Sequence, residues 1–137
     1  MVNNVKDFNA KKEVENIIKF IKEYYKNNNL GGAVIGISGG KDSAVVAALF
    51  TKALGSENII GISMPCHSEP NDMIDAKIIS DYYNFELINF DLTSTYETFK
   101  KELNNSNRYL DENTINADIN LKPRLRMSTL YYFAALY

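Results

Sequence analysis

The sequence has 137 residues, of which 45% are hydrophobic and 23% charged, proportions typical of one globular domain and not of a disordered chain. Its formal net charge of −2 argues against a general binder of nucleic acids or membrane surfaces. A single cysteine, Cys66, cannot form an internal disulfide, which is typical of a cytoplasmic protein. The sequence shows neither the apolar core of a signal peptide nor an apolar run of membrane-spanning length, so we expect no membrane partner.

The first part of the sequence alternates between helical and strand-like patterns. Apolar residues at helical spacing predict a first helix over 11–26, which ends in the sequence NNNLGG. Short apolar segments predict strands at 33–37, 58–64 and 85–90. Apolar stripes of helical period predict further helices at 42–54, 71–83 and 94–103. This alternation predicts the α/β class, with a doubly wound parallel sheet and right-handed crossovers.

The remainder of the sequence is less regular. Residues 104–120 contain six asparagines and no clear periodicity, which predicts a loop. Residues 121–137 resume a helical pattern, and Pro123 suits the first turn of that helix. Because this segment stays apolar and aromatic up to Tyr137, we expect it to pack against a further surface.

Between the first predicted strand and the next helix lies the sequence SGGKDS. Its residues are Ser38, Gly39, Gly40, Lys41, Asp42 and Ser43. The backbone N–H groups of a glycine turn that enters a helix can all point at one anion, and the helix start adds positive potential. The serine hydroxyls can donate to phosphate oxygens, and the lysine can neutralise charge. A carboxylate beside phosphate is repulsive unless a cation lies between them, so Asp42 indicates Mg²⁺.

A simpler interpretation is that Asp42 and Ser43 only cap the following helix. Capping explains neither the paired glycines nor Ser38, so the sequence favours a phosphate loop. A Walker A loop is excluded, because Ile35 stands where its first glycine would be and an aspartate follows the lysine. Ligands of parallel sheets collect beyond the carboxyl ends of the strands, where this loop, the sequence MPCHSEPND and Asp91 converge.

Three single residues near this edge have plainer interpretations. His67, the only histidine, is best interpreted as a loop or substrate-contact residue and not as a general base. Cys66 has no neighbour in the sequence that would form a catalytic dyad with it. Asp91 follows a strand and is best interpreted as a turn residue.

The sequence SGGKDS resembles the SGG-x-DS pyrophosphate loop of the N-type ATP pyrophosphatases, which cleave ATP between the α and β phosphates. That superfamily includes NAD synthetase, GMP synthetase and tRNA-thiolating enzymes. Within it, NLKPRLRMSTLY at 120–131 resembles the N-x-K-x-R-x-R-M-x-x-x-Y segment of NAD synthetase. The sequences MPCHSEPND and INFDLTSTYETF also resemble that family, so the likeness runs from about residue 12 to 137. It implies a fold like that of the adenine-nucleotide α-hydrolases.

The resemblance also implies roles for individual residues. Those that it assigns to ATP are Ser38, Gly39, Gly40, Lys41, Asp42, Ser43 and Met64. Among them, Asp42 would hold Mg²⁺ and the backbone of Met64 would contact adenine. Those that border the deamido-NAD site of the family are Asn120, Arg124 and Arg126.

The reaction implied by the resemblance is the ATP-dependent amidation of deamido-NAD. The nicotinate carboxylate attacks the α-phosphate of ATP, which gives an adenylate and pyrophosphate, and ammonia then displaces AMP to yield NAD. The partners implied are ATP, deamido-NAD and ammonia, together with a second copy of the chain in a homodimer. No glutaminase-like segment is visible in the sequence, which favours free ammonia.

Members of the family continue through another strand and a second metal carboxylate, so we interpret 1–137 as the N-terminal part of one ATP-pyrophosphatase domain. It comprises a nucleotide-binding core at 11–103, the asparagine-rich loop at 104–120, and a helix at 121–137 that we expect at the dimer interface. We expect such a chain to be inactive alone. The alternatives are another N-type pyrophosphatase and a non-catalytic nucleotide-binding or dimerising fragment.

Lys122, Arg124 and Arg126 place three cations at the predicted start of the last helix, where the helix dipole disfavours them. By themselves they are best interpreted as a solvated basic face; with the resemblance they indicate an anionic ligand. Helical spacing puts Lys122 and Arg126 on one face and Arg124 nearly opposite, so one ligand need not contact all three.

Overall fold

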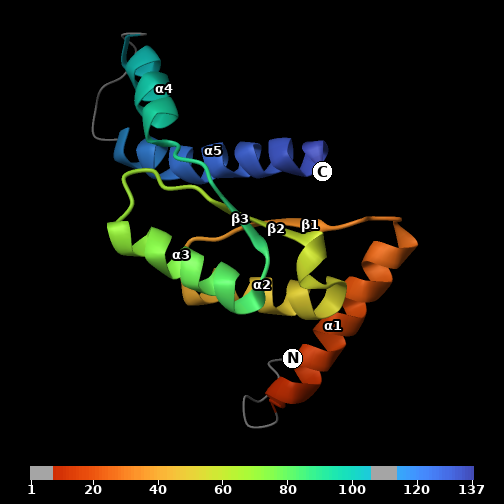
Figure 1. Ribbon diagram of the computed structural model, residues 1–137. Coiled ribbons are helices and arrows are strands. Elements are labelled where there is room, and N and C mark those ends of the chain that lie inside the picture. Colours follow the sequence, from red (N-terminus) through yellow and green to blue (C-terminus); the bar gives the residue numbers. More distant parts are fainter. Residues whose placement is uncertain (1–7, 106–113) are drawn as a thin grey trace.

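The computed structural model describes residues 8–105 and 114–137. The chain forms a parallel sheet with helices on both faces (Figure 1). Its helices are α1 (Ala10–Asn27), α2 (Lys41–Leu54), the short 3₁₀ helix η2 (Ser56–Asn58), α3 (Pro70–Tyr83), α4 (Thr93–Asn105) and α5 (Thr114–Leu136). Its strands are β1 (Ala33–Gly36), β2 (Ile59–Ser63) and β3 (Glu86–Asn89). The α/β class, the parallel sheet and each predicted strand are confirmed, with ends shifted by a residue or so.

The sheet has the order β1-β2-β3, with neighbouring strands parallel throughout. Ala33 lies opposite Ile59, and Ile62 lies opposite Ile88, so β2 is paired on both sides. Helices α2 and α3 cover one face, whereas α5 crosses the other (Figure 1). This two-sided cover explains why the strands read as continuous apolar runs.

Each face of the sheet has its own hydrophobic core. The core beneath α2 and α3 consists of Ala33, Ile35, Ile37, Ala47, Ile59, Ala76 and Phe85. The core on the α5 side consists of Ile62, Met64, Cys66, Leu92 and Tyr96, packed against Leu121, Leu125, Leu130 and Phe133. Ile59 and Ile62 of the same strand therefore serve opposite faces. None of the helices in the described ranges is long and apolar enough to cross a membrane.

The prediction of a loop over 104–120 is wrong for its last residues. Helix α5 begins at Thr114, and Pro123 lies inside it and not in its first turn; residues 106–113 lie outside the described part of the chain. Asparagine disfavours helices in isolation, but Leu121 and Leu125 of the same helix pack on the α5-side core. Because tertiary packing overrides weak local propensity, the helix forms despite its asparagines.

Candidate functional site

The loop from β1 into α2 is a tight glycine turn that is anchored at both ends. Ile37 remains tied to β2, because its N–H donates to the carbonyl of Ile62 at 2.9 Å. Gly39 then takes a left-handed φ of 82°, and a Cβ added there would lie 2.6 Å from the carbonyl oxygen of Asp72. The first turn of α3 therefore packs directly on the loop. Only glycine fits this position, which explains one of the paired glycines in physical terms.

Hydrogen bonds within the loop decide against the simple capping interpretation. Gly40 is the N-cap of α2 and no side chain caps that end within the described residues. The hydroxyl of Ser43 accepts from the N–H of Ser38 at 3.3 Å and donates to the carbonyl of Gly40 at 2.9 Å. The Ser38 hydroxyl lies 3.2 Å from that of Ser43 and accepts from the N–H of Gly40 at 3.3 Å. Both serine side chains thus shape the loop and face one another across it.

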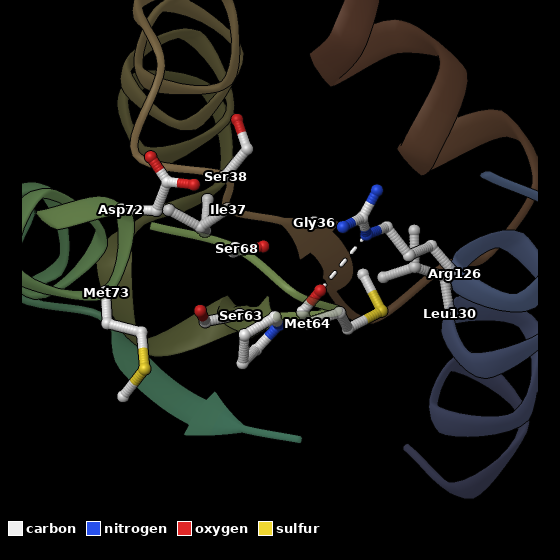
Figure 2. Close-up of a pocket in the computed structure, with 11 residues that line it drawn as sticks. Gly36, Ile37, Ser38, Ser63, Met64, Ser68, Asp72, Met73, Arg126 and Leu130 are labelled. Carbon is white, nitrogen blue, oxygen red and sulfur yellow. Dashed lines mark hydrogen bonds between the residues drawn. The ribbon is translucent and has the colours of Figure 1, made fainter. Parts of the chain in front are cut away.

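A cleft of about 370 Å³ opens beside this loop at the carboxyl end of the sheet (Figure 2). Ser38 lines it, together with Met64 and Pro65, which follow β2. Helix α3 contributes Asp72 and Met73 to one wall, and α5 contributes Arg126 and Leu130 to the other. The structure therefore brings together the predicted phosphate loop, the predicted adenine contact and one predicted arginine.

Two cations of α5 reach the loop that follows β2. Arg126 Nε donates to the carbonyl of Met64 at 3.0 Å (Figure 2), and Lys122 Nζ donates to the carbonyl of Cys66 at 3.2 Å. Both side chains are half-buried, whereas Arg124 is exposed. The prediction that Lys122 and Arg126 share a face is confirmed. The prediction that they lie at the start of the helix, where its dipole disfavours cations, is wrong, because both lie in the middle of α5.

The predicted site residues divide between two faces of α5. Asn120 and Arg124 are both exposed and are spaced i, i+4, on a different side of the helix from Arg126. Met127 and Tyr131 continue that outer face and are 50% and 73% exposed. Arg126 alone of the three predicted deamido-NAD residues therefore lines the cleft.

Asp42 and Ser43 open onto a second hollow, of about 470 Å³, that runs along the free edge of β1. Asp42 lies in the first turn of α2 and is exposed, as is Lys41. Within the described ranges no group of three His, Cys, Asp or Glu side chains could bind a metal ion. Mg²⁺ typically takes one or two carboxylates and completes its shell with phosphate oxygens and water, so the prediction that Asp42 holds Mg²⁺ stays a prediction.

Sequence reasoning placed MPCHSEPND at this edge but singled out neither Ser68 nor Asp72, which both line the cleft. Asp72 belongs to the first turn of α3, so the signal was its position just after the loop that follows β2. Burial raises the pKa of the Cys66 thiol, with Lys122 and Arg126 opposing that shift. Cys66 is 2% exposed and belongs to the α5-side core, so it is a packing residue.

Asp91 has a turn role, as the sequence indicated. Its Oδ1 accepts from the N–H of Thr93 at 2.7 Å, just where α4 begins. Hydrogen bonds from the side chain and then the backbone of Thr93 lower the pKa of Asp91 below its ordinary value of 3.8.

We expect this carboxylate to make stability depend on pH in the acid range. A lowered pKa in the folded state stabilises the fold above the unfolded value of 3.8, and this contribution is lost as pH falls through the lower folded value. Urea unfolding of the wild type and of Asp91→Asn should therefore show a constant difference above about pH 5 that shrinks below pH 3.8. A difference that does not change with pH would contradict this assignment.

Comparison with known proteins resolves the choice among the ATP pyrophosphatases. The sequence model of the NAD synthase family matches residues 13–137, which is nearly all of this chain. The chain belongs to the NAD synthase family. The prediction made from SGGKDS and NLKPRLRMSTLY is thereby confirmed at the level of the family.

Individual members of the NAD synthase family match over about half of their length. The NH(3)-dependent NAD(+) synthetase of Carboxydothermus hydrogenoformans is 40% identical over 127 residues, covering 93% of this chain and 51% of its own. That of Finegoldia magna is 43% identical over 131 residues, covering 92% and 49%. The chain thus spans about half the length of the curated relatives it matches.

Solved structures give the same result. The NH3-dependent NAD synthetase from Campylobacter jejuni, solved with the nitrate ion, superposes with a TM-score of 0.81 at 32% identity and covers 94% of this chain and 53% of its own. The NMN synthetase from Francisella tularensis superposes with a TM-score of 0.82 at 30% identity, covering 96% and 52%. The fold predicted from the sequence is therefore that of the NAD synthase family.

Proposed function

We propose that this chain supplies the nucleotide-binding half of an ammonia-dependent NAD synthetase. The observation that carries the proposal is the single cleft that joins Ser38 of the phosphate loop, Met64 and Arg126. In this proposal ATP lies along the cleft, with its phosphates at the loop and its adenine against the backbone of Met64. The nicotinate carboxylate of deamido-NAD attacks the α-phosphate, pyrophosphate leaves, and ammonia displaces AMP to give NAD.

The residues of the chain act by positioning and by charge neutralisation. The loop at the start of α2 holds the pyrophosphate that departs, and its amides and the hydroxyls of Ser38 and Ser43 exchange their hydrogen bonds within the loop for bonds to phosphate. Lys41 adds a positive charge, and Asp42 would hold Mg²⁺, which supplies further neutralisation of the phosphates when bound. Arg126 projects into the same cleft from α5 and is available to the reacting phosphate or to the nicotinate carboxylate.

We further propose that the outer face of α5 is a homodimer contact. Arg124, Met127 and Tyr131 share this face at spacing i, i+3, i+7, and the apolar members are exposed in the single chain. A second copy packed there would bring Asn120 and Arg124 to the boundary between subunits, where they would contact deamido-NAD. A cytoplasmic location fits the free, buried Cys66, which a reducing compartment keeps unpaired.

One second candidate function concerns the substrate. Because the Francisella tularensis structure is that of an NMN synthetase and superposes as well as the NAD synthetase does, amidation of a mononucleotide is the alternative to amidation of deamido-NAD. Both reactions would use the same phosphate loop. Calorimetric titration of the chain, in the presence of Mg-ATP, with either deamido-NAD or nicotinate mononucleotide distinguishes them by which of the two binds more tightly.

The nucleotide assignment is tested by calorimetric titration of the chain with Mg-ATP. Removal of the Asp42 carboxylate in Asp42→Asn, or of the Ser43 hydroxyl in Ser43→Ala, should weaken binding about tenfold, because each removes a contact to a charged group. Glu15→Gln, an exposed substitution on α1, serves as the matched control and should bind like the wild type.

Since the chain spans about half of its relatives, we expect binding without turnover. Release of AMP together with NAD or NMN by the chain alone would contradict that expectation. Equal Mg-ATP affinities for the wild type and both loop variants would contradict the assignment of the loop itself.

A further inference from the structure

The loop that follows β2 lines the cleft and also contacts helix α4. Met64, Pro65 and Ser68 line the cleft. His67, between them, is directed to α4 instead: its Nε2 lies 2.6 Å from Oε1 of Glu97. Because a carboxylate only accepts hydrogen bonds, the imidazole N–H is the donor. A contact that joins residues thirty positions apart places the loop relative to a separate helix.

Two further contacts fix the same residue. The backbone N–H of His67 donates to the Thr93 hydroxyl at 3.4 Å, and its ring meets the ring of Tyr96 edge-on, with centroids 5.8 Å apart. The backbone of His67 has a left-handed φ of 54°, which residues other than glycine adopt rarely and keep where surrounding contacts hold them. The contacts with α4 hold His67 in this conformation.

Other residues of this loop are held by the segment between β3 and α4 and by α5. The carbonyl of Pro65 accepts from the N–H of Leu92 at 2.8 Å. The carbonyls of Met64 and Cys66 accept hydrogen bonds from Arg126 and Lys122 of α5. The loop is therefore held by both α4 and α5. The α4 contact depends on His67 and Glu97, whose side chains are 47% and 57% exposed and lie outside the cleft.

We propose that His67 and Glu97 are positioning residues that hold the adenine side of the cleft in its binding geometry. The inference rests on the proposed function, because it takes the cleft to be the nucleotide site. Neither residue touches the ligand; they act through the backbone of Met64 and Pro65. The phosphate loop is held by hydrogen bonds among its own residues and by the first turn of α3, and within the described residues no contact joins it to His67 or Glu97. We therefore expect the latch formed by His67 and Glu97 to leave its geometry unchanged.

This division predicts a selective effect on ligands. Glu97→Ala removes the acceptor, and we expect it to weaken binding of Mg-ATP and of AMP by the same factor, about threefold to fivefold, the upper range for an exposed pair. Binding of magnesium pyrophosphate, which requires the phosphate loop alone, should not change. A general loss of structure would weaken the binding of all three ligands.

Variants of the same helix serve as controls in the titrations. Glu97→Gln keeps an oxygen acceptor and should restore affinities close to those of the wild type. Glu102→Ala removes another exposed glutamate of α4 and should have no effect. His67→Ala should weaken binding at least as much as Glu97→Ala, because it removes the ring contact with Tyr96 as well. The double variant should bind no more weakly than His67→Ala alone, because the His67–Glu97 contact is already lost in that variant.

The proposal is overturned if Glu97→Ala binds Mg-ATP and AMP as the wild type does, or if this variant binds magnesium pyrophosphate more weakly by the same factor. Failure of the wild type to bind any of the three ligands would instead contradict the proposed function. The latch itself is observable without ligand, because His67 is the only histidine and its ring resonances are unambiguous. We expect a nuclear Overhauser contact between the rings of His67 and Tyr96 that disappears in Glu97→Ala; its persistence would overturn the latch.

Discussion

Substitution of Gly39 by alanine is expected to abolish measurable Mg-ATP binding and to destabilise the fold by about 1–3 kcal/mol. The residue has a φ of 82°, where a Cβ is strained, and the added carbon would lie 2.6 Å from the Asp72 carbonyl oxygen. That oxygen belongs to the backbone of α3, so relief of the clash must move the helix or the loop. Either movement misplaces the amides that would bind phosphate. Calorimetry and urea unfolding measure the two effects.

The neighbouring glycine provides the matched control. Gly40 has a φ of −78°, and a Cβ there would meet its nearest neighbour, the Ser38 hydroxyl, at 3.4 Å, an ordinary contact. Gly40→Ala should therefore cost less than about 1 kcal/mol, chiefly through a poorer N-cap. If Gly39→Ala and Gly40→Ala had equal effects on stability and on nucleotide affinity, the left-handed conformation of the loop would be wrong.

Ile62→Ala is expected to lower the free energy of unfolding by about 3 kcal/mol, within the 2–5 kcal/mol range for such buried truncations. Ile62 lies in the central strand with no exposed surface and joins β2 to the core beneath α5. The flanking strands and α5 prevent the site from collapsing around the smaller side chain. Urea unfolding followed by circular dichroism measures the loss.

The graded variant Ile62→Val should cost only about 0.5–1.5 kcal/mol, because it removes a single methylene group. Ile78→Ala, an exposed change on α3 where the isoleucine is 59% exposed, provides the surface comparison and should stay within about 0.5 kcal/mol. A loss below 1 kcal/mol for Ile62→Ala would contradict the burial of β2 at the centre of the sheet.

The strands could be predicted because burial on both faces leaves a simple mark in the sequence. Ile59 and Ile62 pack on opposite cores, so the segment is apolar throughout and ends at polar residues. The start of α5 could not be predicted in the same way. Its first turns carry asparagines and gain their stability from Leu121 and Leu125, which contact a core assembled from distant residues.

The candidate site also contains features that could be predicted from the sequence and features that could not. The proposed phosphate loop is local in sequence, so its glycines and serines could be proposed as a binding site from SGGKDS alone. The helical period also separated Arg124 from Arg126 correctly. The contact of Arg126 with Met64 joins residues 62 positions apart, and that of His67 with Glu97 joins residues thirty apart. Neither leaves a pattern in the sequence, and the wall formed by Asp72 depends on how α3 packs on Gly39.

The central claim is that ATP occupies the cleft between α3 and α5. A crystal structure of the chain with Mg²⁺ and the α,β-methylene analogue of ATP, whose α–β linkage resists cleavage, tests it most directly. We predict the β and γ phosphates against the amides and hydroxyls of Ser38–Ser43, with the adenine on the backbone of Met64. A nucleotide bound elsewhere, with the cleft beside Arg126 unfilled, would contradict the claim.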